Sequence, residues 1–107
     1  MEIGAKSTST LVVTEQRTAA VMGSGDLPVL ATPAMIALME NAAMKAVASA
    51  LPEDQTTVGS LMNASHLKPT AVGDTVSASA TLVAVEGRKL TFRVEAHDSE
   101  GVIGEGD

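Results

Sequence analysis

Residues 34–47 read Ala-Met-Ile-Ala-Leu-Met-Glu-Asn-Ala-Ala-Met-Lys-Ala-Val, and this stretch decides the fold. It is apolar on nearly every side, which is typical of a helix buried in a core rather than one on a surface. Thr32 and Pro33 come just before it and favour a helix start, because threonine is a good N-cap and proline suits the first helical position. Pro52 ends it, since the residue before a proline avoids helical angles. We therefore expect one long helix over residues 33–50.

Alternating runs of apolar and polar residues predict strands on both sides of this helix. The clearest run places Phe92 and Val94 on one face of a strand and Arg93 and Glu95 on the other. The predicted strands are residues 8–13 and 18–22 before the helix, then 56–67, 75–85, 90–97 and 102–103 after it.

The pair Glu86-Gly87 separates two of these runs and signals a tight turn, so we expect those strands to be antiparallel neighbours. A helix on one side of an antiparallel sheet makes an α+β fold. One apolar helix wrapped by a curved sheet is the hot-dog arrangement. We expect residues 1–107 to form a single domain of this kind.

The composition excludes several classes of partner and site. A formal charge of −6 argues against general nucleic-acid binding, which depends on neutralising phosphates. The chain has no cysteine, so it forms no disulfide and no thiolate metal site. Its two histidines are far apart in sequence and give no metal signal.

The apolar residues are mostly small, with one Phe and no Trp or Tyr. Small side chains fill a core thinly, and a short chain buries a modest share of its surface, so we expect a subunit partner. No apolar run approaches the roughly 18 residues of a membrane span. The first residues lack an apolar signal region, and we expect a cytoplasmic protein.

Glu40 is the one acid inside the apolar helix. At about 100° per residue it shares a stripe with Ile36, Ala43 and Val47, so we expect it to be buried. Desolvation raises the pKa of a carboxyl in such a place, which suits a general acid or base near neutral pH. The alternative is a structural carboxylate satisfied by neighbouring polar groups.

Thr32 has two interpretations. Threonine before a proline at a helix start is most simply a cap. Otherwise its hydroxyl faces a substrate at the helix N-terminus, where free backbone N–H groups polarise a carbonyl. Because Pro33 has no N–H, we expect Ala34 and Met35 to supply those donors.

Three residues outside the helix are candidates for a role at a site. His66 and His97 are the two histidines, and a lone strand histidine is more often structural than catalytic. His97 alternates with Arg93 and Glu95, so we expect it on the outer face of the sheet. A glycine within a predicted strand, as at Gly59, indicates a bulge or the close approach of a ligand to the backbone.

Together these residues resemble the fluoroacetyl-CoA thioesterase-like family of hot-dog proteins, over about residues 26–107. Each motif is weak alone, but their order is fairly specific. The motifs are Val29-Leu-Ala-Thr32, Leu38-Met-Glu40-Asn-Ala, Thr57-Val-Gly59, His66 followed by Pro69-Thr-x-x-Gly73, Val85-Glu-Gly-Arg88-Lys-Leu and Ile103-Gly-Glu-Gly106.

The resemblance implies that Thr32, Glu40 and His66 form a catalytic triad and that the backbone of Gly59 helps at the substrate. It also implies a homodimer with active sites at the subunit interface. Helix geometry agrees, because Thr32 and Glu40 are separated by about 12 Å of helix rise and should not touch within one chain. A two-fold interface could join Thr32 of one subunit to Glu40 of the other.

Two features depart from the family pattern. The named family member shields its substrate with aromatic residues ahead of the helix, whereas the loop 23–28 is short and has none. This difference argues against selectivity for the fluoroacetyl group. The chain also stops at Asp107, where the family pattern continues through one more strand, so the chain is either a fragment or naturally short at this edge.

We therefore predict an acyl-CoA thioesterase that acts on a small acyl group and needs no cofactor, with CoA thioester as substrate. Either Glu40 activates a water while Thr32 and His66 assist, or Thr32 or Glu40 attacks first and an acyl-enzyme is hydrolysed. Basic residues should meet the CoA phosphates. The candidates are Lys68, Arg88, Lys89 and Arg93, and we single out Lys68 and Arg88.

Two other functions fit a hot-dog domain. An enoyl-CoA hydratase usually places an aspartate five residues before its histidine, but here that position is Leu61. A non-catalytic module could instead hold acyl-CoA and buffer it or signal its level. The set of Thr32, Glu40 and His66 argues against that module.

Overall fold

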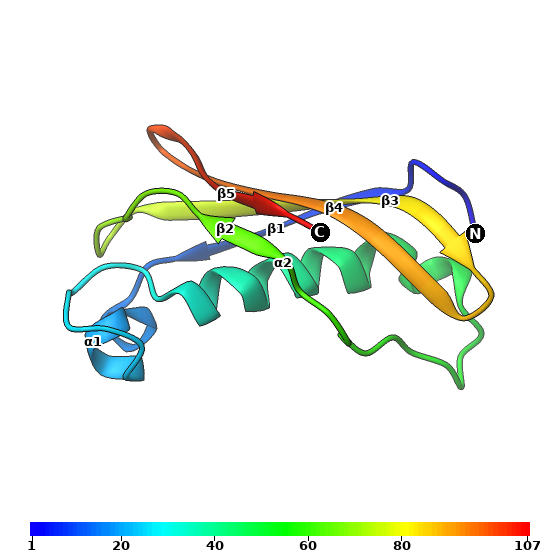
Figure 1. Ribbon diagram of the computed structural model, residues 1–107, viewed down its shortest axis with the longest axis horizontal. Coiled ribbons are helices and arrows are strands. Elements are labelled where there is room, and N and C mark those ends of the chain that lie inside the picture. The colour runs from blue at the N-terminus through cyan, green and yellow to red at the C-terminus, as the bar shows by residue number, and fades with distance from the viewer.

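An antiparallel sheet of five strands, in the order β1-β3-β4-β5-β2, curves around one long helix (Figure 1). The computed structural model describes all of residues 1–107. The strands are β1 (Lys6–Val12), β2 (Ala64–His66), β3 (Thr75–Glu86), β4 (Lys89–Asp98) and β5 (Gly101–Gly106). The helices are α1 (Ala19–Met22) and α2 (Thr32–Val47), with 3-10 turns at Glu15–Arg17 and Ala48–Ala50. The predicted α+β arrangement is confirmed.

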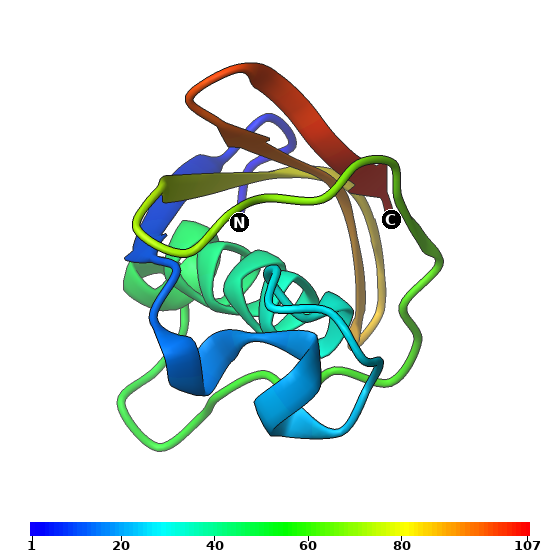
Figure 2. The same cartoon turned by 90° about the vertical axis from the view of Figure 1, so that its left-hand side faces the viewer.

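Helix α2 lies in the hollow of the sheet, and α1 lies near the end where α2 begins (Figure 2). The buried face of α2 packs on the inner faces of β1, β3 and β4, and Met35 lies against Gly104 of β5. On the helix this face is Ala34, Met35, Leu38, Met39 and Ala42; on the sheet it includes Val76, Ala78, Ala80, Val94, Ala96 and Ile103.

The expected orientation of α2 is wrong at Glu40. The helix turns Met35 and Met39 inward, with no exposed surface, and leaves Glu40 on an exposed face. The reason is that α2 carries alanines on all of its faces, so its apolar residues define no single stripe. Two residues of the expected Glu40 stripe do face inward. Ile36 packs at the margin of the core, and Val47 is buried.

The predicted strand over 18–22 is also wrong, because these residues form α1. The hydroxyl of Thr18 accepts a hydrogen bond from the N–H of Val21 at 3.3 Å and caps the short helix. Gly23 ends it with a φ of 81°, a left-handed conformation that glycine adopts without strain. An apolar run of this length fits a strand or a helix equally well, and the cap decides between them.

Of the predicted strand 56–67, only Ala64–His66 pairs within the sheet. Asn63 and Asp107 exchange two backbone hydrogen bonds of 3.0 and 3.1 Å at the end of the β2–β5 ladder. Residues 56–62 lie beyond that ladder, so no strand of this chain lies next to them. Met62 packs against the core, whereas Val58 and Leu61 are in solvent, 86% and 80% exposed.

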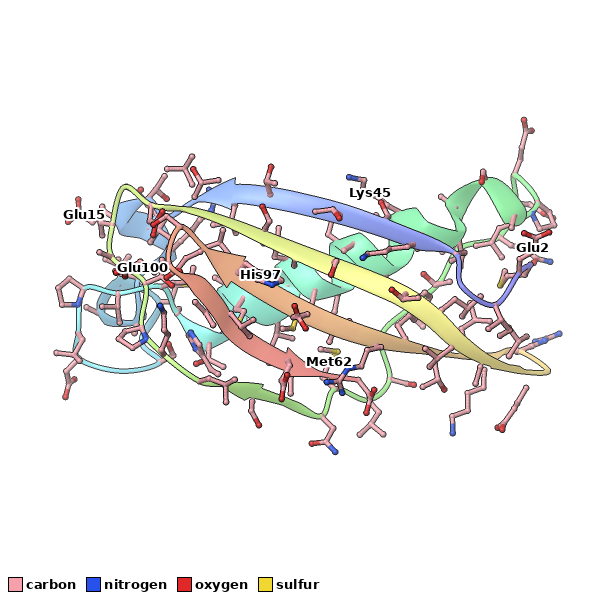
Figure 3. All side chains as sticks on the ribbon, turned by 90° about the horizontal axis from the view of Figure 1, so that it is seen from above. Glu2, Glu15, Lys45, Met62, His97 and Glu100 are labelled. Carbon is pink, nitrogen blue, oxygen red and sulfur yellow. The ribbon has the colours of Figure 1, made fainter.

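The second half of the chain follows its prediction closely. Strands β3 and β4 pair antiparallel around the turn at Gly87, which has a φ of 62°. Val94 and Ala96 are buried, whereas His97 lies on the outer face of the sheet, as Figure 3 shows. There its Nε2 is 2.7 Å from the carboxylate of Glu95. None of the helices combines the length and the apolar character needed to cross a membrane.

Candidate active site

The hydroxyl of Thr32 lies 2.7 Å from Nδ1 of His66, although the two residues are 34 positions apart in sequence. Thr32 is the first residue of α2, and His66 ends β2. His66 is held in register opposite Gly104 of β5, and Leu67 donates its N–H to the carbonyl of Ile103 at 2.6 Å. The edge of the sheet therefore carries the imidazole to the N-terminus of the helix.

Thr32 does not cap the helix. Ala31 occupies the N-cap position, and no side chain caps this end. The N–H groups of Ala34 and Met35, which we expected to be free, both donate to the carbonyl of Ala31, at 3.0 and 3.1 Å. The N–H of Thr32 itself donates no backbone hydrogen bond, so it is the available donor of the first turn.

Burial shapes the chemistry of the His66 ring. Desolvation lowers the pKa of His66 below its ordinary value of 6.5, and a backbone contact with Lys68 acts in the opposite direction. Nε2 is buried and has no hydrogen-bond partner. Burial therefore favours a neutral imidazole, in which Nδ1 can accept the hydroxyl proton of Thr32 while the ring proton sits on Nε2.

A cavity of about 280 Å³ opens beside this pair. Its polar groups come from Thr32, His66 and Lys68, and the rest of its lining is aliphatic. The lining residues are Ala19, Val29, Leu30, Thr32, His66, Leu67, Lys68 and Pro69. The short segment α1 and the strand that carries His66 thus border a small, open and mostly apolar hollow next to a hydroxyl and a base.

Glu40 of α2 and Gly59 of the segment after the helix form a second pair. A Cβ added to Gly59 would overlap with Oε2 of Glu40 and lie 3.4 Å from its Cδ, so the carboxylate occupies the space that a side chain would need. Both residues are exposed, and the predicted burial of Glu40 is wrong for the isolated chain. Gly59 lies in an irregular segment rather than in the strand that we expected.

The structure thus brings the predicted residues together as two pairs and not as one triad. Thr32 and Glu40 are eight positions apart on α2, which corresponds to about 12 Å along the helix axis. Within one chain the carboxylate sits by Gly59, whereas the hydroxyl sits by His66.

Of the predicted basic residues, Lys68 lines the cavity and Arg88 does not. Arg88 is exposed in the turn between β3 and β4, which Figure 1 shows at the end of the molecule where α2 finishes. The side chain of Lys68 is 36% exposed and lies 3.7 Å from the carboxylate of Asp98. No group of three or more His, Cys, Asp or Glu side chains is placed to hold a metal ion.

Sequence reasoning missed Asp98, whose side chain is only 2% exposed. The Thr70 hydroxyl donates to it at 2.9 Å, and the N–H of Glu100 does so at 2.8 Å. Burial opposes the charge of Asp98, but these bonds and the Lys68 ammonium outweigh it and hold the pKa below its ordinary value. Asp98 comes before Ser-Glu-Gly, a composition typical of an exposed turn, so the sequence carries no signal of its burial.

Known proteins resemble this chain in sequence. The model of the fluoroacetyl-CoA-specific thioesterase family matches residues 13–107. The fluoroacetyl-CoA thioesterase of Streptantibioticus cattleyicolor is 41% identical over 78 residues, which are 73% of this chain and 56% of that protein. The chain therefore spans little more than half the length of this relative.

Solved structures share the fold. A phenylalanine-to-alanine variant of the fluoroacetyl-CoA-specific thioesterase in complex with fluoroacetate and CoA is 34% identical, with a TM-score of 0.92 over 99% of this chain and 90% of that one. A thioesterase superfamily member from Thermus thermophilus is 33% identical, with a TM-score of 0.89 over 98% of this chain and 78% of that one. The hot-dog fold is confirmed, and the chain belongs to the fluoroacetyl-CoA-specific thioesterase family.

Proposed function

We propose that this protein is an acyl-CoA thioesterase that hydrolyses a small acyl-CoA at a site shared by two subunits. The observation that carries the proposal is the 2.7 Å approach of the Thr32 hydroxyl to Nδ1 of His66, beside a small cavity. A hydroxyl within hydrogen-bond reach of a neutral imidazole is the arrangement of an activated nucleophile and its base. Membership of a thioesterase family supports the same chemistry.

The geometry favours first attack by Thr32. The Thr32 proton passes to Nδ1 of His66 while Oγ1 bonds to the thioester carbonyl carbon, and the C–S bond then breaks. The proton on His66 goes to the departing CoA sulfur, and a water hydrolyses the acyl-threonine with the same base. The N–H of Thr32 is the backbone donor for the negative oxygen. Direct activation of a water by the same base is the alternative, and mass spectrometry after rapid acid quenching separates the two, because only the first adds an acyl group to Thr32.

A homodimer would complete the site. The pair of Glu40 and Gly59 is exposed in one chain and lies about 12 Å along α2 from Thr32. Gly59 belongs to the segment 56–62, whose backbone pairs with no strand of this chain and whose Val58 and Leu61 side chains are exposed. A two-fold axis that pairs these segments would place Glu40 and Gly59 of one subunit near Thr32 and His66 of the other. The partner's carboxylate would then stabilise the imidazolium that forms on His66.

The substrate proposal follows from the cavity lining. Alanine, valine and leucine side chains line it beside the reacting pair, and the only aromatic residue of the chain, Phe92, is not among them. Such a lining suits a short aliphatic acyl group and offers no aromatic shield for a fluoroacetyl group. Lys68 at the rim and Arg88 in the β3–β4 turn are our candidates for contacts with the CoA phosphates.

Thiol release measured over a panel of acetyl-, butyryl-, isobutyryl-, benzoyl-, fluoroacetyl- and crotonyl-CoA tests the function. We expect release from the short aliphatic members and no marked preference for fluoroacetyl-CoA. The chain has no cysteine, so the protein adds no thiol background. Hydration of crotonyl-CoA without thiol release would indicate a hydratase, and binding without either reaction would indicate a binding module.

Subunit mixing tests the shared site. Thr32→Val and Glu40→Gln homodimers should each be inactive, but a shared site regains one intact Thr32–Glu40 combination in every mixed dimer. Random mixing should therefore restore about a quarter of the wild-type sites. Mixtures that stay as inactive as the separate variants would show that the three residues act within one chain.

A further inference from the structure

Asp98 is a buried charge that the proposed reaction does not use. Its side chain is 2% exposed and lies at the end of β4, where the chain turns into β5. Oδ2 accepts the hydroxyl of Thr70 at 2.9 Å, while Oδ1 accepts the N–H of Glu100 at 2.8 Å and faces the Lys68 ammonium at 3.7 Å. A buried carboxylate is costly unless it is paired, and hydrogen bonds to its charge are strong. The groups that pair with Asp98 are therefore fixed in position.

The partners of Asp98 belong to the segment that follows His66. Lys68 is two residues and Thr70 four residues after the imidazole, and both side chains point to the same carboxylate. Thr70 is itself buried, with 2% exposure. Asp98 therefore fixes the course of the chain immediately beyond His66 at two points.

The same segment also holds the start of α2. The carbonyl of Thr70 accepts the N–H of Leu30 at 2.9 Å, and Val29 forms a bridge with Ala71. Leu30 comes two residues before Thr32. One carboxylate thus connects, through Thr70, to the strand that carries His66 and to the loop that carries Thr32.

We infer that Asp98 is a positioning residue that sets the distance between Thr32 and His66 through Thr70 and Lys68. This inference rests on the proposed thioesterase function, in which that 2.7 Å distance matters for proton transfer. Asp98 touches neither reacting group. Its effect should appear in kcat, because small misplacement of reacting groups lowers the rate while the binding surfaces stay intact.

Three variants test the inference. Asp98→Asn keeps the shape and removes the charge, and Thr70→Val removes the hydroxyl that meets it. Both should lower kcat about tenfold to a hundredfold, and Thr70→Val, which leaves the Lys68–Asp98 pair in place, should change KM less than about threefold. Thr70→Ser keeps the hydroxyl and should restore kcat to within about threefold of wild type. Should Asp98→Asn fail to fold, the two Thr70 variants carry the comparison.

The matched control is Ser99→Ala, in the same turn. The Ser99 hydroxyl donates to Asp74 at 2.8 Å, and neither residue forms a hydrogen bond with His66, Lys68 or Thr70. This variant should keep the wild-type kcat. If Thr70→Val lowers the melting temperature by about 4–8 °C but leaves kcat within twofold of wild type, Asp98 only supports the fold and the inference is wrong.

A second readout does not depend on activity. The ring nitrogens of His66 can be followed by long-range ¹H–¹⁵N NMR, with His97→Gln used to assign the two histidines. We expect the Nδ1 signal to change in Asp98→Asn and Thr70→Val and to stay at its wild-type position in Ser99→Ala. If the wild-type protein released no thiol, the proposed function would fail, and these spectra would still decide the positioning role. Unchanged spectra in both variants would overturn it.

Discussion

The carboxylate of Glu40 occupies the space where Gly59 would carry a side chain. Only glycine at position 59 allows this approach, because a Cβ there would overlap with Oε2. The group that would be displaced is the far end of a flexible side chain, so the conflict moves Glu40 rather than the fold. Gly59 therefore decides where the acid points.

The first prediction concerns Gly59→Ala. It should lower kcat at least about tenfold, since Glu40 must rotate away from its present position. The free energy of unfolding should change by less than about 1 kcal/mol, because both residues are exposed. Gly25→Ala is the matched control, since its new Cβ would meet Ala19 at an ordinary 3.4 Å. Full activity in Gly59→Ala would mean that the position of Glu40 is unimportant.

The second prediction concerns the ionisable members of the site. Glu40→Gln and His66→Ala should each lower kcat at least about a hundredfold, the range of general acid–base catalysis, while the protein stays folded. Glu53→Gln, at an exposed position in the loop after α2, should have wild-type kinetics. Size-exclusion chromatography and circular dichroism confirm folding, and undiminished turnover in either site variant would remove that residue from the mechanism.

The third prediction is a pH profile. Desolvation lowers the pKa of His66 below 6.5, and the Lys68 backbone offsets this shift only in part. His66 must be neutral to accept a proton, so kcat/KM should be constant above that pKa and fall as the pH drops through it. We therefore expect the midpoint of the acidic limb below 6.5, measured with a fixed acyl-CoA. A midpoint above 6.5 would show that a negative charge from outside the chain, such as the partner's Glu40, outweighs the desolvation of His66.

The fourth prediction concerns stability in acid. Burial opposes ionisation of Asp98, but the Glu100 N–H, the Thr70 hydroxyl and Lys68 outweigh it and lower the pKa below 3.8. A group with a depressed pKa in the folded state stabilises the fold fully above its unfolded pKa, and this stabilisation is lost as the pH falls through its folded pKa.

Asp98→Asn should thus cost about 2 kcal/mol near neutral pH and less at pH 2, measured by urea unfolding at each pH. Asp54→Asn, in an exposed loop, should unfold like the wild type at neutral pH. An equal loss for Asp98→Asn at both pH values would show that its charge is not the stabilising feature.

The fifth prediction concerns packing behind His66. A Cβ on Gly104 would lie 2.5 Å from Sδ of Met35 and 3.0 Å from the carbonyl of Ser65. Gly104→Ala should therefore cost about 1–3 kcal/mol, since overpacking a closed core forces a shift. Met35→Ala removes the colliding sulfur, so the double variant should lose less than the sum of the single variants. Additive losses in thermal unfolding would place the strain at the backbone of Ser65 instead.

The sequence predicts those parts of the fold that local patterns determine. Alternation defines β3 and β4, and Thr32-Pro33 marks the start of α2 to within one residue. The run 18–22 was misassigned because a single hydroxyl, that of Thr18, converts it into a helix. Residues 56–62 have side chains typical of a strand, but a strand also needs a neighbouring strand to pair with. A local sequence pattern does not show whether that neighbour exists.

The sequence selects the candidate site residues, but their geometry depends on the fold. The spacing and resemblance selected Thr32 and His66, and the structure places them in contact. Glu40 was expected inside the core because an alanine-rich helix has no clear polar face, and it lies outside. Asp98 was invisible because the contacts that bury it come from Thr70 and Lys68, about thirty positions earlier in the chain. The cytoplasmic location and the homodimer stay predictions.

The separation of Thr32 and Glu40 along α2 has a consequence for how the protein behaves in dilute solution. Eight helical positions hold Glu40 away from Thr32, and no motion of a rigid helix shortens that distance. A chain alone would then carry two incomplete halves, and turnover per chain would depend on the protein concentration, halving where half of the chains are dissociated. The expression level would then change the total activity in two ways, through the number of chains and through the fraction of chains that form dimers.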